Sequence, residues 1–221
     1  MKDYETASYF YDRCLEVSVQ FKYIQGEALG YRGLGICEES VGNLFPAMRH
    51  LETSQDKAKE GDFVQHFKVI SSDLVRVYQK IADDYQNRGD FNSSLQFFEN
   101  CLNVSRSAND KDKEAECYQQ IGMIYEKQGQ LDRSIEFINK YLDLCVETRN
   151  VEKQGQAHKK LAEVHSKNGD TSSAIKNLED VLRIALDQEN KAYKAEATLK
   201  LGLLYNAPGK EQNIKKSADF L

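Results

Sequence analysis

The segment YQQIGMIYEKQGQLDRSIEFINKYL, residues 118–142, decides the fold. From Tyr118 to Tyr125 its apolar and small residues recur at three- and four-residue spacing, which places them on one face of a helix. Gly129 interrupts this pattern, and the same spacing resumes at Leu131. Glycine ends helices readily because it adopts the left-handed conformation at little cost. The segment therefore predicts two antiparallel helices that need neighbours to bury their apolar faces.

The same pattern recurs along the whole chain. Turn glycines stand at Gly42, Gly89, Gly129, Gly169 and Gly209. Seven residues before each is a small residue suited to a close helix crossing: Gly35, Ala82, Gly122, Ala162 and Gly202. The residue directly before each small residue is apolar: Leu34, Ile81, Ile121, Leu161 and Leu201. Three residues after each small residue stand Glu38, Tyr85, Tyr125, His165 and Tyr205. Five coincident patterns at one period predict an all-α repeat array.

The turn glycines are 40 residues apart, except for a step of 47 between Gly42 and Gly89. The seven extra residues fall in or near KAKEGDFVQHFKVI, residues 57–70, and amount to about two helical turns. We expect longer helices with a break near Gly61 and Asp62. The alternative is a protruding loop that aromatic residues of this segment pack down.

We expect a single array over residues 1–221. Its parts are the second helix of an incomplete repeat at 1–24, complete repeats at 25–70, 71–110, 111–150 and 151–190, and a truncated repeat at 191–221. Asn43, Asp90 and Asp170 follow turn glycines and should cap the next helix. Neither end carries a polar capping helix, so each end should expose an apolar face. We therefore expect that the chain continues on both sides or docks at its ends.

Composition excludes several classes of function. The formal net charge is −5 and no basic stripe is visible, which argues against nucleic-acid binding. No apolar run reaches the length of a membrane span. The five cysteines are odd in number and lie at unrelated spacings, which is typical of buried, reduced thiols in a cytosolic protein.

The repeated pattern resembles the tetratricopeptide repeat, which has an aromatic residue, Leu-Gly and Tyr on its first helix, and Ala, Phe and Ala on its second. The resemblance covers essentially the whole chain. It implies an α-solenoid, a right-handed superhelix of antiparallel helix pairs. The period of 40 exceeds the common period of about 34, and the usual closing proline is absent, with Arg106 at one such position. The long period is similar to a branch found in spindle-orientation scaffolds and ciliary proteins.

Within that family, residues 9–52 and 193–206 are most similar to an axonemal member of motile cilia and flagella. This resemblance implies a non-catalytic scaffold of the ciliary or flagellar cytoskeleton that supports axoneme assembly or dynein-driven beating. Its partners would be dynein-associated or doublet microtubule proteins. Two alternatives stay open: a cytosolic peptide-binding adaptor of the spindle-orientation type, and a fragment of an enzyme whose catalytic domain lies outside these residues.

An array of helix pairs is expected to present a groove lined by first-helix residues. The predicted lining is Arg32, Ile36, Arg76, Gln79, Asp83, Gln119, Met123, Glu126, Lys159, Glu163 and Lys167. Such a mixed surface suits an extended or helical peptide, although each residue alone could simply face solvent. Chaperone-binding relatives clamp a carboxylate with an asparagine directly after Leu-Gly. Here that position holds no asparagine, and Asp83 and Glu163 would repel a carboxylate, so no such clamp is expected.

The remaining candidate motifs do not predict catalysis or a cofactor. His158 and His165 occupy positions where sister repeats carry packing residues, so we expect no metal site there. Asp110, Asp112 and Glu114 alternate as in a calcium loop but lack its glycine and its distant glutamate. No phosphate loop, nucleophile elbow or catalytic carboxylate pair occurs. We therefore expect no enzyme activity, no cofactor and no small-molecule substrate.

Overall fold

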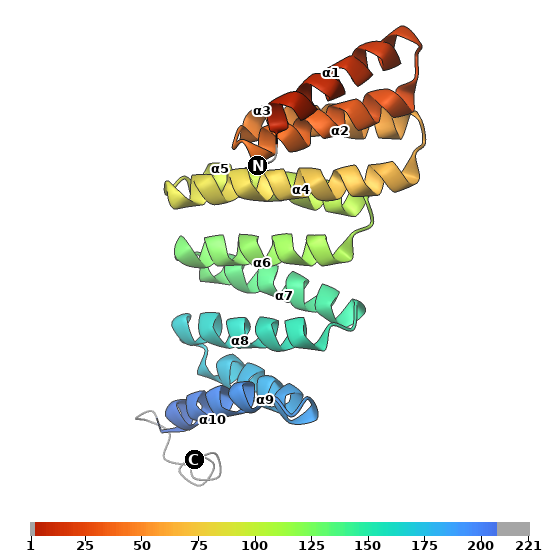
Figure 1. Cartoon of the computed structure of the whole chain (residues 1–221). Helices are drawn as coiled ribbons and strands as arrows, with labels where there is room; N and C mark the ends of the chain where they lie inside the picture. The colour runs from red at the N-terminus through yellow and green to blue at the C-terminus, as the bar shows by residue number, and fades with distance from the viewer. Residues whose placement is uncertain (1–2, 207–221) are drawn as a thin grey trace. The chain divides into compact units, whose positions relative to one another are not determined.

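The structure is a computed structural model that describes residues 3–206, which form ten helices and contain no strand (Figure 1). The helices are α1 (Tyr4–Gln20), α2 (Ile24–Ser40), α3 (Leu44–Glu60), α4 (Val64–Asn87), α5 (Phe91–Ser107), α6 (Lys111–Lys127), α7 (Leu131–Glu147), α8 (Val151–Lys167), α9 (Thr171–Asp187) and α10 (Lys191–Tyr205). Within α1 to α5 and within α7 to α10, successive helices pack against each other as antiparallel neighbours, so the predicted all-α array of helix pairs is confirmed.

Contacts divide the chain into two compact units, Met1–Cys117 and Tyr118–Leu221. Helices α1 to α5 belong to the first unit and α7 to α10 to the second, while α6 contributes to both. The second helix expected from Lys210 onward, with the turn at Gly209, lies outside the described residues. None of the helices in residues 3–206 combines the length and apolar composition that a membrane crossing requires.

Each turn inside a helix pair contains the expected left-handed glycine. The φ angles are 89° at Gly42, 81° at Gly89, 74° at Gly129 and 79° at Gly169. A Cβ added at any of the four would meet no atom within 4 Å. These positions therefore require glycine for its backbone conformation and not for lack of space.

The turns between repeats use the same conformation without glycine, which the sequence did not reveal. Their left-handed residues are Lys22, Asp62, Asn109, Arg149 and Glu189, all with φ of 54° or 55°. An L-residue pays roughly 1–2 kcal/mol for this conformation. Glycine is thus required only at the turn within each pair, and the turn between pairs carries a small strain.

Two of the small residues that precede turn glycines, Gly35 and Gly122, lie at close helix crossings, as expected. A Cβ on Gly35 of α2 would approach Leu51 Cγ of α3 to 2.7 Å. A Cβ on Gly122 would approach Ile138 Cγ1 of α7 to the same distance of 2.7 Å. The facing residues Leu51 and Ile138 are themselves fully buried. These crossings bring the helices of each pair close enough to form the core.

The long step is taken up by one helix. Helix α4 is 24 residues long, whereas α3 and α5 have 17 each. The chain breaks at Gly61 to Phe63, so the expectation of a longer helix is confirmed and no loop protrudes. The repeat boundary expected between residues 70 and 71 falls inside α4, because the extra residues join the helix that follows the break.

Helix α1 packs mainly against α2, and it does so closely. A Cβ on Gly33 of α2 would overlap the ring of Tyr11. Helix α1 and the turn after it also carry many exposed apolar side chains, as expected for an end without a capping helix. These are Tyr9, Phe10, Tyr11, Val17, Val19, Phe21 and Tyr23.

Of the three predicted helix caps, two are confirmed and one needs correction. Asp90 and Asp170 cap α5 and α9 by accepting from the backbone N–H of Ser93 and Ser173. Asn43 occupies the cap position of α3 but does not cap it, because its amide donates instead to Glu38 Oε2 at 2.7 Å.

The cysteines are all free thiols, but one is not buried. Cys37, Cys101, Cys117 and Cys145 are buried as expected, and burial raises the pKa of the Cys37 thiol. Cys14 is exposed, contrary to expectation. The reason is its place on α1, which has a close neighbour on one side only.

Candidate protein-binding surface

In the first unit, the charged first-helix residues are held by neighbouring first helices. Arg76 of α4 donates two hydrogen bonds to Glu39 of α2, at 2.8 and 2.7 Å, and one to Asp73 at 2.8 Å. Arg32 of α2 donates to the other oxygen of Asp73 at 2.7 Å, and Lys80 donates to Glu39 at 2.7 Å. These bonds join α2 to α4 across the expected groove.

The acidic members of this network are the buried ones. The side chains of Glu39 and Asp73 are only 6% and 9% exposed, whereas that of Arg76 is 45% exposed. The hydrogen bonds from Arg76, aided by Lys80, lower the pKa of Glu39 despite its burial. The same contacts raise the pKa of Arg76. Buried carboxylates of this kind must be paired to be tolerated.

The second unit repeats the arrangement with lysines. Glu126 of α6 accepts from Lys167 at 2.5 Å and pairs with Lys160 at 2.7 Å, both from α8. Burial acts to raise the pKa of Glu126, but the two lysines outweigh it and the net shift is downward. Further along, Lys159 and Glu163 of α8 pair with Glu196 and Lys200 of α10, at 2.7 and 3.0 Å.

The predicted lining is thus divided between two units and largely engaged in these networks. The first unit contains Arg32, Ile36, Arg76, Gln79 and Asp83, and the second contains Gln119, Met123, Glu126, Lys159, Glu163 and Lys167. Their uncharged members are half-buried, and Asp83 is exposed. The structure links Arg32 to Arg76 through Asp73, and Glu126 to Lys167 directly. That a partner binds them stays a prediction.

Sequence reasoning missed the partners in these networks, although a periodic signal was present. Glu39 and Glu126 both stand three residues before a turn glycine. Lys80, Lys160 and Lys200 all stand nine residues before one, counting Gly209 for the last. The pairs Glu39–Lys80 and Glu126–Lys160 are therefore equivalent contacts in different repeats. Comparing charged positions between repeats would have found them.

An open cavity of 310 Å³ lies on the first-helix face of the second unit, between α8 and α10. Its lining consists of Ala162, Glu163, Ser166, Lys167, Leu178, Lys200, Leu203 and Leu204. Glu163 and Lys167 belong to the predicted set, and Leu203 is 64% exposed. The cavity therefore offers an apolar floor bordered by lysines, an arrangement that suits a short peptide.

Of the two histidines, His158 contacts a residue of α9, whereas the buried His165 Nδ1 has no hydrogen-bond partner in the described structure. His158 Nδ1 lies 2.9 Å from Asn177 Oδ1, and His165 Nδ1 lies 3.5 Å from Asp170 Oδ2. Within residues 3–206, no group of three or more His, Cys, Asp or Glu side chains is placed to hold a metal ion.

Comparison with known proteins agrees with this geometry. Residues 73–145 match the tetratricopeptide repeat. This match spans α5, α6 and parts of the helices on either side of them. No curated protein matches the sequence significantly.

Solved structures extend the tetratricopeptide-like fold to nearly the whole chain. BtubC (BKLC) from P. vanneervenii is 16% identical with a TM-score of 0.58, over 99% of this chain and 89% of that one. Aspartyl phosphate phosphatase F from Bacillus subtilis is 15% identical with a TM-score of 0.58, over 96% of this chain and 54% of that one. The Rap conjugation regulator of plasmid pLS20, solved with the Phr* peptide, is 16% identical with a TM-score of 0.52, over 99% and 58%. At these identities the likeness concerns the fold alone. This fold is suited to contacts between proteins.

Proposed function

We propose that the chain is a non-catalytic protein–protein scaffold of the axoneme in motile cilia or flagella, where it supports assembly or dynein-driven beating. The scaffold role is supported by one observation in particular: in each unit, buried carboxylates join two consecutive first helices, α2 to α4 through Glu39 and Asp73, and α6 to α8 through Glu126. A surface held in this way is preorganised, and preorganisation lowers the entropic cost of binding a partner.

The axonemal role rests on sequence resemblance. Residues 9–52 and 193–206 resemble tetratricopeptide repeat protein 29, an axonemal protein of motile cilia and sperm flagella. The partners implied are dynein-associated or doublet microtubule proteins, with the axoneme as the location.

Proximity labelling or cross-linking mass spectrometry in ciliated cells tests this role. We expect recovery of dynein-arm or doublet proteins by the chain. The Gly122→Leu variant, which should be unable to form its helix crossing, provides the background for non-specific labelling. Recovery of cortical or chaperone proteins alone would rule out the axonemal proposal.

A second candidate function is that of a cytosolic peptide-binding adaptor of the spindle-orientation type. The cavity between α8 and α10 favours it, and the Rap regulator solved with a peptide has the same fold. Peptides selected from a displayed library on the immobilised chain should lose affinity with Leu203→Glu, which places a charge in the cavity. Leu199→Glu is the matched control, because Leu199 is 57% exposed on the same helix and does not line the cavity. Equal loss in both variants would contradict the adaptor function.

A further inference from the structure

Helix α4 extends past the helix that follows it. Helices α4 and α5 meet at the Gly89 turn and run antiparallel, but α4 has 24 residues and α5 has 17. Helix α5 therefore ends, at Ser107, about seven residues or 10 Å short of the start of α4. Over those first two turns α4 packs on α2 and α3, where Ile70, Ala28 and Ala58 form a buried cluster with Phe67. On the side toward α5, the start of α4 borders an open cavity that also reaches Asn103, Val104 and Ser107 at the end of α5.

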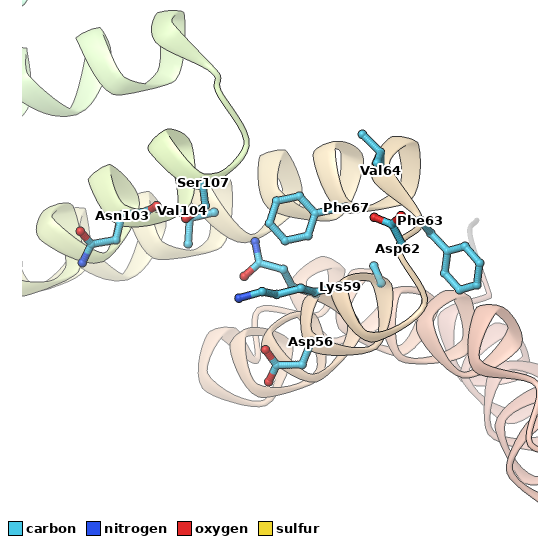
Figure 2. A pocket seen from close by; sticks show the side chains of 11 residues that line it. Asp56, Lys59, Asp62, Phe63, Val64, Phe67, Asn103, Val104 and Ser107 are labelled. Atoms are coloured by element: carbon cyan, nitrogen blue, oxygen red, sulfur yellow. Dashed lines mark hydrogen bonds between the residues drawn. The ribbon is translucent and has the colours of Figure 1, made fainter.

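An open cavity of 550 Å³, here called the step cavity, fills the space that a longer α5 would occupy (Figure 2). Its lining consists of Gln55, Asp56, Ala58, Lys59, Asp62, Phe63, Val64, Phe67, Asn103, Val104 and Ser107. The ring of Phe67 points toward Val104 and Ser107 across the cavity in Figure 2. Val64 is 55% exposed at its edge. The step cavity thus has an apolar floor and an open side.

The charged residues of the step cavity differ from those on the first-helix face. Asp56, Lys59 and Asp62 are exposed, and none of them forms an ion pair with another residue in the described part of the chain. The first-helix networks, in contrast, occupy both oxygens of Glu39, Asp73 and Glu126. Charges that are already paired add little on binding, whereas the step cavity has charges available for a partner.

The unit that contains the step cavity is acidic. Residues 1–117 hold 14 Lys and Arg against 20 Asp and Glu, whereas residues 118–221 hold 16 against 15. The entire negative excess of the chain is therefore in the first unit. Its field would attract a basic partner and repel an acidic one.

We propose that the step cavity is a docking site for about two turns of a longer basic amphipathic helix of a partner protein. The helix would continue the line of α5 along the start of α4. Its apolar face would contact Phe67 and Val104, and its lysines or arginines would pair with Asp56 and Asp62. This site is separate from the first-helix face, so the chain would contact two partners at once.

The probe for the test is a stapled helical peptide of about 14 residues with leucines along one face and lysines flanking them. Its affinity for the 221-residue chain is measured by fluorescence anisotropy. We expect the Asp56→Lys, Asp62→Lys double variant to bind at least about tenfold more weakly, since two ion pairs become repulsive contacts. Lys22 and Arg149 adopt the same backbone conformation as Asp62, so the backbone tolerates lysine there.

The repeat supplies a matched control. Asp143 of α7 and Glu189 stand at the positions equivalent to Asp56 and Asp62, and neither lines the step cavity. The Asp143→Lys, Glu189→Lys variant makes the same change in net charge and should bind the peptide as the natural sequence does. A filling variant, Ser107→Trp, should block binding without any change of charge, with Asp187→Trp on α9 as its control.

Three outcomes would overturn the proposal. The first is equal affinity in the step-cavity and control variants. The second is equal binding of a peptide in which glutamates replace the lysines. The third is self-association of the chain in sedimentation equilibrium that only the step-cavity variants abolish, which would assign the cavity to a second copy.

Discussion

At the scale of single residues, Gly122 and Gly129 stand in the same helix pair but must be glycine for different reasons. Gly122 is needed for space, because a Cβ there would lie 2.7 Å from Ile138 Cγ1. Gly129 is needed for its φ of 74°, and the space around it is open. Substitution should separate these two reasons.

Gly122→Leu should reduce the free energy of unfolding by about 3 kcal/mol, since a large side chain is forced into a filled crossing. Gly129→Ala should cost only about 1–2 kcal/mol, the strain of a left-handed L-residue. Urea unfolding followed by circular dichroism measures both. Unchanged cooperative unfolding of Gly122→Leu would show that α6 and α7 do not cross there.

The strained turns between repeats predict a stabilising change. Arg149→Gly should raise the free energy of unfolding by up to about 1 kcal/mol, because relief of left-handed strain exceeds the entropy that glycine adds to the unfolded chain. The control is Arg133→Gly, which changes an exposed residue inside a helix and should lower the free energy of unfolding by about 1 kcal/mol. Thermal melts of both variants decide the matter, and a loss of stability with Arg149→Gly would count against a strained turn.

At the scale of helices, the buried carboxylates connect one repeat to the next and make stability depend on pH. The pKa of Glu39 is lowered below its ordinary value of 4.5 in the folded chain. A lowered pKa means that the charged form is stabilised, so its contribution is complete above pH 4.5 and is lost as the pH falls through the folded value. Protonation of Glu39 should therefore weaken the contact between α2 and α4 in acid.

Glu39→Gln should lower the free energy of unfolding by about 2 kcal/mol at pH 7, since it removes charge-assisted hydrogen bonds from Arg76 and Lys80. The difference from the natural sequence should shrink as the pH falls below 4.5. Unfolding in urea at a series of pH values measures this convergence. Glu136→Gln, which breaks the exposed pair with Lys140, should have a much smaller effect. Parallel curves for Glu39→Gln and the natural sequence would be inconsistent with a lowered pKa.

At the scale of the whole molecule, each helix of a repeat array is stabilised by its nearest neighbours. Helix α1 packs mainly on α2, and Ser18 is its only buried residue in the described structure. Helices α4 and α8, in contrast, each pack against the helix before and the helix after them, and each contains several buried residues. Stability should therefore vary along the chain.

Hydrogen exchange of the 221-residue chain should show this variation. Amides of α1 should exchange markedly faster than those of α4, and Gly33→Ala should widen the gap because its Cβ would overlap the Tyr11 ring. Mass spectrometry of peptic fragments gives the rates. Protection of α1 equal to that of α4 would mean that α1 is covered in solution.

The fold could be predicted from the sequence because its requirements are local. A left-handed glycine such as Gly129 and a small residue such as Gly122 are visible at fixed spacing. The inter-repeat turns were not visible, since Arg149 and Asn109 are ordinary residues in the same conformation. In the first-helix networks, the Glu39–Lys80 and Glu126–Lys160 pairs could have been found by comparing repeats, but the Arg32–Asp73 pair could not. Whether Asp73 faces Arg32 depends on which end of α4 carries the two extra turns, and spacing alone does not determine that.

The seven extra residues of α4 also set a rule for insertions in this chain. Seven residues rotate a helix through nearly two full turns and leave its faces within about 20° of their former direction. Downstream residues such as Ile81 therefore still face the core, where Ile81 is 2% exposed. A single inserted residue would instead turn every later side chain of the helix by about 100° and direct the core face toward solvent. Natural length variants of this helix should therefore differ by three, four or seven residues. Insertions of these lengths keep the core face of the helix directed toward its neighbours.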